Sequence, residues 1–137
     1  MYRAALITGG AKRLGRELAL ALARRKINVV VHYNRSVDEA TETVEQALSY
    51  GVKAVSLQAD LLNLQASRDL VVRASKALGQ PLDVLVNNAS IFEYDRLDTV
   101  TPEGWDRHIN SNLRAPLFLT QAFGAQVPEA ISDENNE

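Results

Sequence analysis

One glycine-rich stretch near the start of the chain could form a phosphate site: Thr8-Gly9-Gly10-Ala11-Lys12-Arg13-Leu14-Gly15. An apolar run over 4–7 precedes them and a helical pattern follows, which predicts a strand, a tight turn and a helix start. The first amides of a helix have no partner within it, and the helix dipole favours anions there. Glycines also let a ligand approach the main chain closely. The alternative is a glycine-rich turn that binds nothing, and this stretch alone does not decide between the two.

The composition is that of one soluble domain. The chain has 137 residues, of which 46% are hydrophobic, which is enough for a substantial core. A net charge of −2 gives no reason to expect nucleic acid or an anionic membrane as a partner. We expect neither a membrane span nor a signal peptide. With no cysteine and two histidines, we expect no disulfide and no metal site, and a cytoplasmic location.

The elements that must position the glycine-rich turn alternate between strand and helix. Apolar runs and helical periodicities, with their caps, predict strands over 4–7, 27–33, 52–58 and 82–87 and helices over 13–26, 36–50, 64–78 and 101–126. Ser36 and Glu39 have the spacing of a capping box, and Thr101-Pro102-Glu103 is typical of a helix start.

This alternation predicts an α/β fold with a doubly wound, Rossmann-type parallel sheet. Right-handed crossovers give the strand order 3-2-1-4 for the strands present. Ligands in such sheets bind beyond the carboxyl ends of the strands, where the order reverses. We assign residues 1–126 to this domain and 127–137 to a polar tail that we expect to be disordered.

The segment after the second strand indicates which dinucleotide such a site would bind. A site selective for NAD places an acidic residue against the ribose 2′-hydroxyl. Here Tyr33-Asn34-Arg35-Ser36 stands at that position, and the first acid after the second strand is Asp38. The guanidinium of Arg35 and the hydroxyl of Ser36 suit a 2′-phosphate, which favours NADP(H). Alternatively, Ser36 only caps its helix and Arg35 is solvated.

Several ordered motifs resemble the short-chain dehydrogenase/reductase family, and within it the pteridine reductases. The family turn is T-G-x-x-x-G-x-G, and Arg13 replaces its middle glycine, as in the pteridine reductase group. The other matching stretches lie at 32–36, 58–61, 83–90 and 110–112, the last followed by Ala115-Pro116. The resemblance covers about residues 2–124 and implies an NADPH-dependent oxidoreductase that reduces a pterin or a dihydrofolate-like substrate by hydride transfer. It also implies a homo-oligomer, commonly a tetramer, formed partly through the helix at 102–126.

The resemblance also implies roles for individual residues. The residues expected at the NADP(H) site are Gly9, Arg13, Leu14, Gly15, His32, Tyr33, Asn34, Arg35, Ser36, Asp60, Leu61, Asn88, Ala89 and Ser90. Arg13, Ser90 and Phe92 are expected at the substrate, with the Phe92 ring stacked on the pterin. Each residue also has a plainer interpretation: Asp60 as a strand-end residue, Asn87-Asn88 as a turn, and Phe92 as part of the core.

Asn112 is a further candidate because Pro116 follows it by four residues. Proline has no amide, so the Asn112 carbonyl loses its helical partner and becomes free to bind something else. In the family, the matching asparagine holds a water that links the catalytic lysine to solvent. The alternative is a proline kink in a long helix.

The catalytic Tyr-x-x-x-Lys of the family is absent. Tyrosines occur at 2, 33, 50 and 94, none with lysine four residues later, and no lysine follows Lys76. The later strands of the family sheet are also missing, which would leave the strand at 82–87 as an open apolar edge. We therefore expect a cofactor-binding half that is inactive alone and not a self-sufficient folding unit. The alternatives are a non-catalytic NADP-binding module and a fragment without binding.

Overall fold

The computed structural model describes residues 2–128. Four parallel strands form one sheet: β1 (Ala4–Ile7), β2 (Asn28–Tyr33), β3 (Ala54–Gln58) and β4 (Val84–Val86). Their order is β3-β2-β1-β4, so the predicted order is confirmed. In register, Leu6 of β1 lies between Val30 of β2 and Leu85 of β4.

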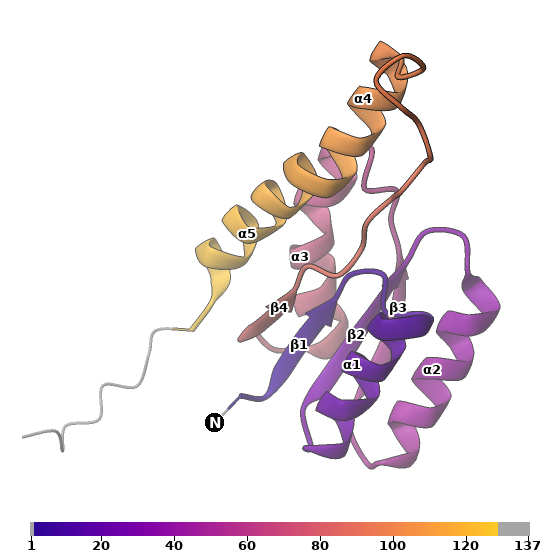
Figure 1. The fold of residues 1–137 in the computed structure, drawn as a ribbon. Coiled ribbons are helices and arrows are strands. Elements are labelled where there is room, and N and C mark those ends of the chain that lie inside the picture. Colours follow the sequence, from indigo (N-terminus) through magenta and orange to yellow (C-terminus); the bar gives the residue numbers. More distant parts are fainter. Residues whose placement is uncertain (1, 129–137) are drawn as a thin grey trace, which may run out of the picture.

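Helices cover both faces of the sheet (Figure 1), as in a doubly wound fold. On one face lie α1 (Arg13–Arg24) and α2 (Val37–Ser49), and on the other lie α3 (Leu64–Leu78) and α5 (Ala115–Gln126). The alternation of side chains along β1 divides the core in two. Leu6 packs with Leu70 and Leu119 on the α3–α5 side, whereas Ile7 packs with Leu20 on the α1–α2 side.

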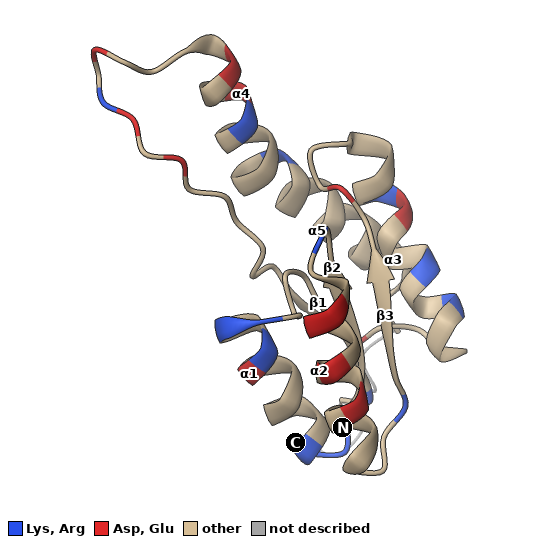
Figure 2. Ribbon diagram, turned by 90° about the vertical axis from the view of Figure 1, so that its right-hand side faces the viewer, with Lys and Arg blue, Asp and Glu red and all other residues tan. Residues whose placement is uncertain are grey.

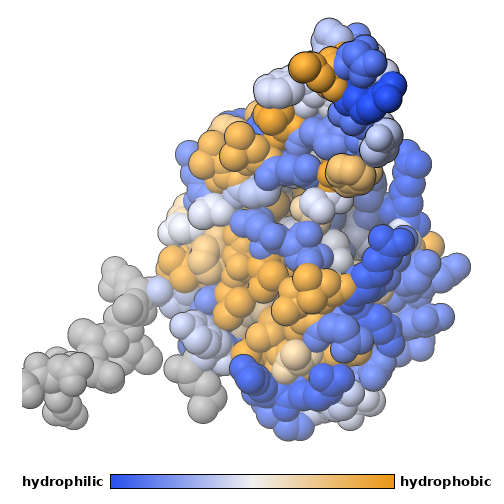
Figure 3. All heavy atoms as spheres, viewed as in Figure 1, coloured by the Kyte–Doolittle hydropathy of each residue, from blue (hydrophilic) through white to orange (hydrophobic). Residues whose placement is uncertain are grey.

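The strands carry no charged residue, and Figure 2 shows the acidic and basic residues on helices and loops. This pattern follows from the burial of both faces of a parallel sheet. Apolar side chains also reach the surface on the side where β4 and α5 lie (Figure 3). There β4 forms one edge of the sheet and its residues are only half-buried, while Leu113 and Leu117 are exposed.

The helix predicted over 101–126 is interrupted. It consists of α4 (Pro102–Ile109), a π turn (Asn110–Arg114) and α5. The Ala115 amide donates to the Asn110 carbonyl five residues back, the hydrogen bond of a π-helix. Apolar periodicity alone could not reveal the extra residue in this turn.

Two helix ends have the predicted caps, but α1 ends at Arg24, two residues before the predicted end, and one predicted cap does not form. Thr101 Oγ1 accepts from the Gly104 amide at 3.0 Å, and Gly79 ends α3 in the left-handed conformation. Ser36 is at the N-cap of α2, but its side chain makes no cap hydrogen bond, so the predicted capping box does not form. In α1 the buried face consists of Gly15, Ala19, Leu20 and Ala23, whereas Leu14 is exposed. Small residues there let α1 approach the sheet closely.

Candidate functional site

The turn between β1 and α1 opens the amide end of α1 toward a cavity. The N-cap residue Lys12 has extended backbone angles and provides no side-chain cap, because an ammonium group cannot accept a hydrogen bond. Gly9 and Arg13 have positive φ angles of +61° and +54°, a region that favours glycine. The first amides of α1 therefore remain available to an anionic ligand.

The glycines of this turn are required by packing. A Cβ on Gly15 would lie 2.0 Å from the Gly9 carbonyl oxygen and 2.6 Å from Asn88 Nδ2. A Cβ on Gly9 would lie 3.0 Å from the Ala89 Cα. The start of α1, the turn and the segment after β4 thus touch through their backbones.

Thr8 ties the turn to the end of β4. Its Oγ1 accepts from the amides of Asn88 and Ala89, both at 3.0 Å, and donates to the Val86 carbonyl at 3.3 Å. In return, Asn88 Nδ2 donates to the carbonyls of Thr8 and Gly9. These bonds hold residues 88–90 beside the glycine-rich turn.

His32, at the end of β2, lies between the turn and the end of β3. The Gly9 amide donates to its Nδ1 at 3.0 Å, and its Nε2 is 2.8 Å from the Ala59 carbonyl oxygen. Burial lowers the pKa of His32 below its usual 6.5; the Ala59 hydrogen bond opposes this shift and the charge of Arg73 adds to it.

Arg35 and Ser36 follow β2, and their side chains are available to bind a ligand. Among residues 2–128, the Arg35 guanidinium makes no ion pair, and Ser36 lacks its cap bond. Asn34 is fixed by Gln58, whose Nε2 donates to its side-chain oxygen at 3.1 Å. After β3, Asp60 uses one carboxylate oxygen to accept from the Leu62 amide.

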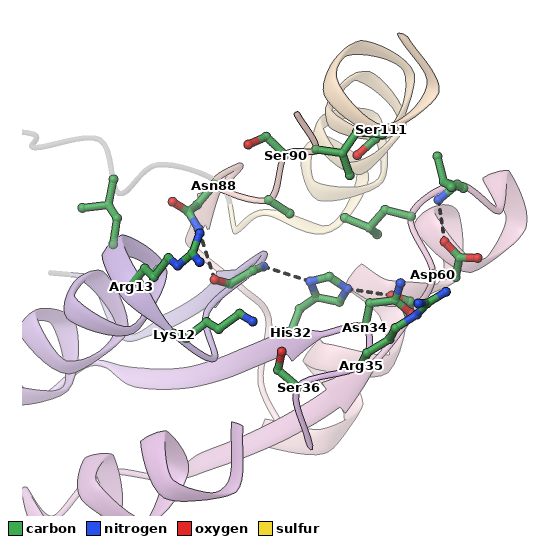
Figure 4. Close-up of a pocket in the computed structure, with 18 residues that line it drawn as sticks. Lys12, Arg13, His32, Asn34, Arg35, Ser36, Asp60, Asn88, Ser90 and Ser111 are labelled. Carbon is green, nitrogen blue, oxygen red and sulfur yellow. Dashed lines mark hydrogen bonds between the residues drawn. The ribbon is translucent and has the colours of Figure 1, made fainter. Parts of the chain in front are cut away.

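These segments line one cavity of about 650 Å³, shown in Figure 4. Lys12 and Arg13 lie on one side of His32, and Asn34, Arg35 and Asp60 lie on the other. The lining includes every residue predicted for the cofactor except Tyr33, namely Gly9, Arg13, Leu14, Gly15, His32, Asn34, Arg35, Ser36, Asp60, Leu61, Asn88, Ala89 and Ser90. The structure thus brings the predicted residues together, and their roles stay predictions.

Sequence reasoning missed part of this lining: Lys12, Ala59, Leu62, Ile91 and Ser111. Lys12 could have been found from its basic side chain within the glycine-rich turn. Tyr33 was included, yet its side chain packs on the α1–α2 side of the sheet. The alternation of side chains along a strand could have shown that His32 and Tyr33 face opposite ways.

The candidate substrate residues are divided between two places. Arg13 and Ser90 line the cavity, but Phe92 is 84% exposed. Its ring lines a second hollow of about 530 Å³ together with Glu93, Asp95, Arg96, Leu97, Val100, Trp105 and His108. The segment that contains Phe92 and Glu93 is joined to α4 by an ion pair of 2.6 Å between Arg107 and Glu93. The hydrogen bonds from the Arg107 guanidinium lower the pKa of the Glu93 carboxyl group.

Asn112 holds the segment after β4 through its side chain. Its Oδ1 accepts from the Ile91 amide and its Nδ2 donates to the Ile91 carbonyl, both at 2.9 Å. Asn112 does not line the cavity, whereas its neighbour Ser111 does. The role predicted for the Asn112 carbonyl stays a prediction.

No group of three or more His, Cys, Asp or Glu side chains within residues 2–128 could hold a metal ion. No helix in that range is both long enough and apolar enough to cross a membrane.

Residues 3–132 match the family model of the short chain dehydrogenases. The chain belongs to this family. A short-chain dehydrogenase/reductase, FrzI, from a Cladobotryum species is 36% identical over 120 residues, which are 88% of this chain and 46% of that protein. The chain thus spans about half the length of the curated relatives that it matches.

Solved structures of short-chain dehydrogenases share this fold. One from Burkholderia cenocepacia, in complex with NADP, has a TM-score of 0.89 and 35% identity over 93% of this chain and 51% of its own. The FolM alternative dihydrofolate reductase 1 from Brucella canis, complexed with NADP, has a TM-score of 0.87 and 35% identity over the same shares of the two chains.

Proposed function

We propose that this chain is the NADP(H)-binding half of a short-chain reductase that reduces a pterin or a dihydrofolate-like substrate. The observation that carries the proposal is that the uncapped start of α1 and the unpaired Arg35 guanidinium line the same cavity. That combination suits a dinucleotide with an additional phosphate on its adenosine ribose.

The residues present fit this cofactor. The pyrophosphate would bind at the open amides of α1 with Arg13, and the 2′-phosphate at Arg35 and Ser36. Asp60 retains a carboxylate oxygen that could accept from the adenine amino group, since only its other oxygen bonds the Leu62 amide. Relatives in complex with NADP support the assignment.

The nicotinamide end would lie near residues 88–90, which Thr8 holds beside the turn. When bound, the nicotinamide supplies a hydride. This chain's own residues would bind and orient the cofactor, with Ser90 and Arg13 exposed to a substrate in the same cavity. Phe92 would offer its exposed ring to a flat substrate, and a relative named as a dihydrofolate reductase supports this substrate class.

Proton donation must come from elsewhere, because the chain contains no Tyr-x-x-x-Lys. The second candidate is a module that binds NADP(H) without catalysis. We also propose a homo-oligomer formed partly through α4, the π turn and α5, where Leu113 and Leu117 are exposed. The tetramer and the cytoplasmic location stay predictions.

Calorimetric titration of the 137-residue chain with NADPH and with NADH tests the proposal. We expect NADPH to bind at least about tenfold more tightly than NADH, because one charge-assisted hydrogen bond contributes about 1.5–3 kcal/mol. The circular dichroism spectrum shows whether the chain is folded, and no binding of either nucleotide by the folded chain would overturn both candidates. Binding to the chain, with reduction of dihydropterin only by a longer protein that contains Tyr-x-x-x-Lys, would favour the reductase over the module.

A further inference from the structure

His32 is the one buried histidine among the described residues, with 2% of its surface exposed. We propose that His32 is a positioning residue, whose neutral Nε2–H form fixes the phosphate-binding turn to the end of β3, and whose protonation weakens nucleotide binding. This inference rests on the NADP(H) site proposed above. It concerns how the site is held rather than which groups contact the ligand.

The two partners of the ring determine which nitrogen carries the proton. The Gly9 amide can only donate, so Nδ1 must present its lone pair. The Ala59 carbonyl can only accept, so Nε2 must carry the hydrogen. Only one neutral tautomer satisfies both contacts. A protonated ring would place an N–H of Nδ1 against the Gly9 amide, and this amide would lose its acceptor.

The contacts connect two parts of the proposed site. Gly9 belongs to the phosphate-binding turn, where its φ is +61°. Ala59 immediately precedes Asp60 and Leu61, which line the adenine side of the cavity. The His32 carbonyl also accepts from the Gly10 amide at 3.0 Å. The ring therefore sets the spacing between the phosphate and adenine ends of the cavity, and Figure 4 shows it linked to both sides.

The basic groups around His32 oppose its protonation. Arg73 of α3 acts on the ring by its charge, and its guanidinium is held by the Gln58 carbonyl at 2.9 Å. Lys12, Arg13 and Arg35 line the same cavity from the turn, α1 and the segment after β2, and Asp60 is the one acid in that lining. Neutral His32 adds no charge to the site. It therefore contributes to nucleotide binding by orienting the Gly9 amide.

Two substitutions separate the two contacts of the ring. In His32→Asn the side-chain oxygen can take the place of Nδ1, which keeps an acceptor for Gly9. In His32→Gln the side-chain amide can take the place of Nε2, which keeps the donor to Ala59 but loses the acceptor. Neither side chain titrates between pH 5 and 8. His108→Asn, at the only other histidine of the chain, is the matched control.

The experiment is calorimetric titration of the 137-residue chain and these variants with NADPH from pH 8 to pH 5.5. At pH 8 we expect His32→Asn to bind within about threefold of wild type and His32→Gln to bind roughly tenfold more weakly, as for a buried amide without its acceptor. On acidification, wild type should lose roughly tenfold more affinity than His32→Asn. The 2′-phosphate of the ligand also titrates near pH 6, but it does so equally with every variant.

Equal affinities for the two His32 variants at pH 8, or a loss on acidification that His32→Asn shares fully with wild type, would overturn the inference. Tighter binding by wild type at pH 5.5 would overturn it as well. ¹⁵N NMR of the imidazole in the free chain is independent of NADPH and should show Nε2 protonated and Nδ1 not; the opposite tautomer overturns the inference. If wild type binds no NADPH but shows the expected tautomer, the proposed function fails and the contacts of His32 stand.

Discussion

Gly15 lies directly against the carbonyl oxygen of Gly9, so that a Cβ on Gly15 would stand 2.0 Å from that oxygen. No side chain fits into this contact, and the oxygen belongs to backbone that Asn88 holds from the other side. The close approach brings the amide end of α1 over the turn, the arrangement that an anion site at a helix start requires.

Gly15→Ala should therefore lower the free energy of unfolding by about 1–3 kcal/mol, as expected for overpacking, and should abolish NADPH binding. Urea denaturation and calorimetric titration measure the two effects. The control is Gly124→Ala in α5, where a Cβ meets nothing within 4 Å. Because alanine favours a helix over glycine, the control should gain about 0.5–1 kcal/mol. Unchanged NADPH affinity in Gly15→Ala would contradict the packing argument.

Arg13→Gly should raise the free energy of unfolding and weaken the binding of NADPH. Arg13 has a φ of +54°, which costs a non-glycine residue about 1–2 kcal/mol, so glycine relieves strain. Without the guanidinium, NADPH should bind at least about tenfold more weakly. Lys26→Gly is the matched control, since Lys26 has a φ of +66° and does not line the cavity. If the control weakens NADPH binding as much as Arg13→Gly does, the role proposed for the Arg13 guanidinium in binding the cofactor is wrong.

Arg35→Ala should weaken NADPH binding at least about tenfold and NADH binding less than about threefold, because only NADPH carries the 2′-phosphate. Titration with each nucleotide gives the ratio. Arg25→Ala, at the far end of α1, should change neither affinity. Equal losses for both nucleotides in Arg35→Ala would remove the assignment of NADP(H).

His32 should make folding stability depend on pH. Because burial holds its pKa below 6.5 in the folded chain, the unfolded chain binds the proton more readily. Its contribution to stability is complete above pH 6.5 and is lost as the pH falls toward the folded pKa, by at most about 1.4 kcal/mol per pH unit. Urea midpoints at pH 7.5 and 5.5 should fall less for His32→Asn than for wild type, while His108→Asn should follow wild type. An equal fall in His32→Asn would show that carboxyl groups alone cause the dependence.

Phe92→Ala should leave NADPH affinity unchanged and raise the KM for a pterin in a longer protein that contains Tyr-x-x-x-Lys. The ring is exposed and lies outside the cavity, so its loss removes a contact for substrate only. Tyr94→Ala removes a neighbouring exposed aromatic ring that lines neither hollow and serves as the control. A loss of NADPH affinity in Phe92→Ala would contradict the proposed stacking role.

The sequence predicted most of this architecture because parallel strands buried on both faces form unmistakable apolar runs. The strand at Ala4–Ile7 and the helix at Leu64–Leu78 have the predicted bounds, and the strand order followed from the handedness of crossovers. The ends of β3 and β4 were less predictable, since Val52 and Leu82 are apolar but lie outside the strands. The Ser36 side chain makes no cap hydrogen bond. The spacing of Ser36 and Glu39 could not predict this, because such a bond also depends on the side-chain rotamer.

Within the site, the residues at the ends of strands were predictable because these ends meet at one edge of the sheet. Phe92 was harder, because it lies beyond Ile91 in a segment without regular structure. The contacts of His32 could not be foreseen from its position alone, because they require Gly9 and Ala59 at the right distance in space. Ser111 reaches the cavity from the π turn, an element that the apolar pattern did not indicate.

The π turn has a consequence for insertions and deletions in this part of the chain. A π turn is a helical turn that holds one residue in excess, and each residue of an α-helix rotates the next by about 100°. Removing one residue within 110–114 would restore a continuous helix, but α4 would then swing around the helix axis relative to α5. Length variants among related sequences should therefore fall outside this turn, or occur in it only together with a rebuilt connection to Ile91.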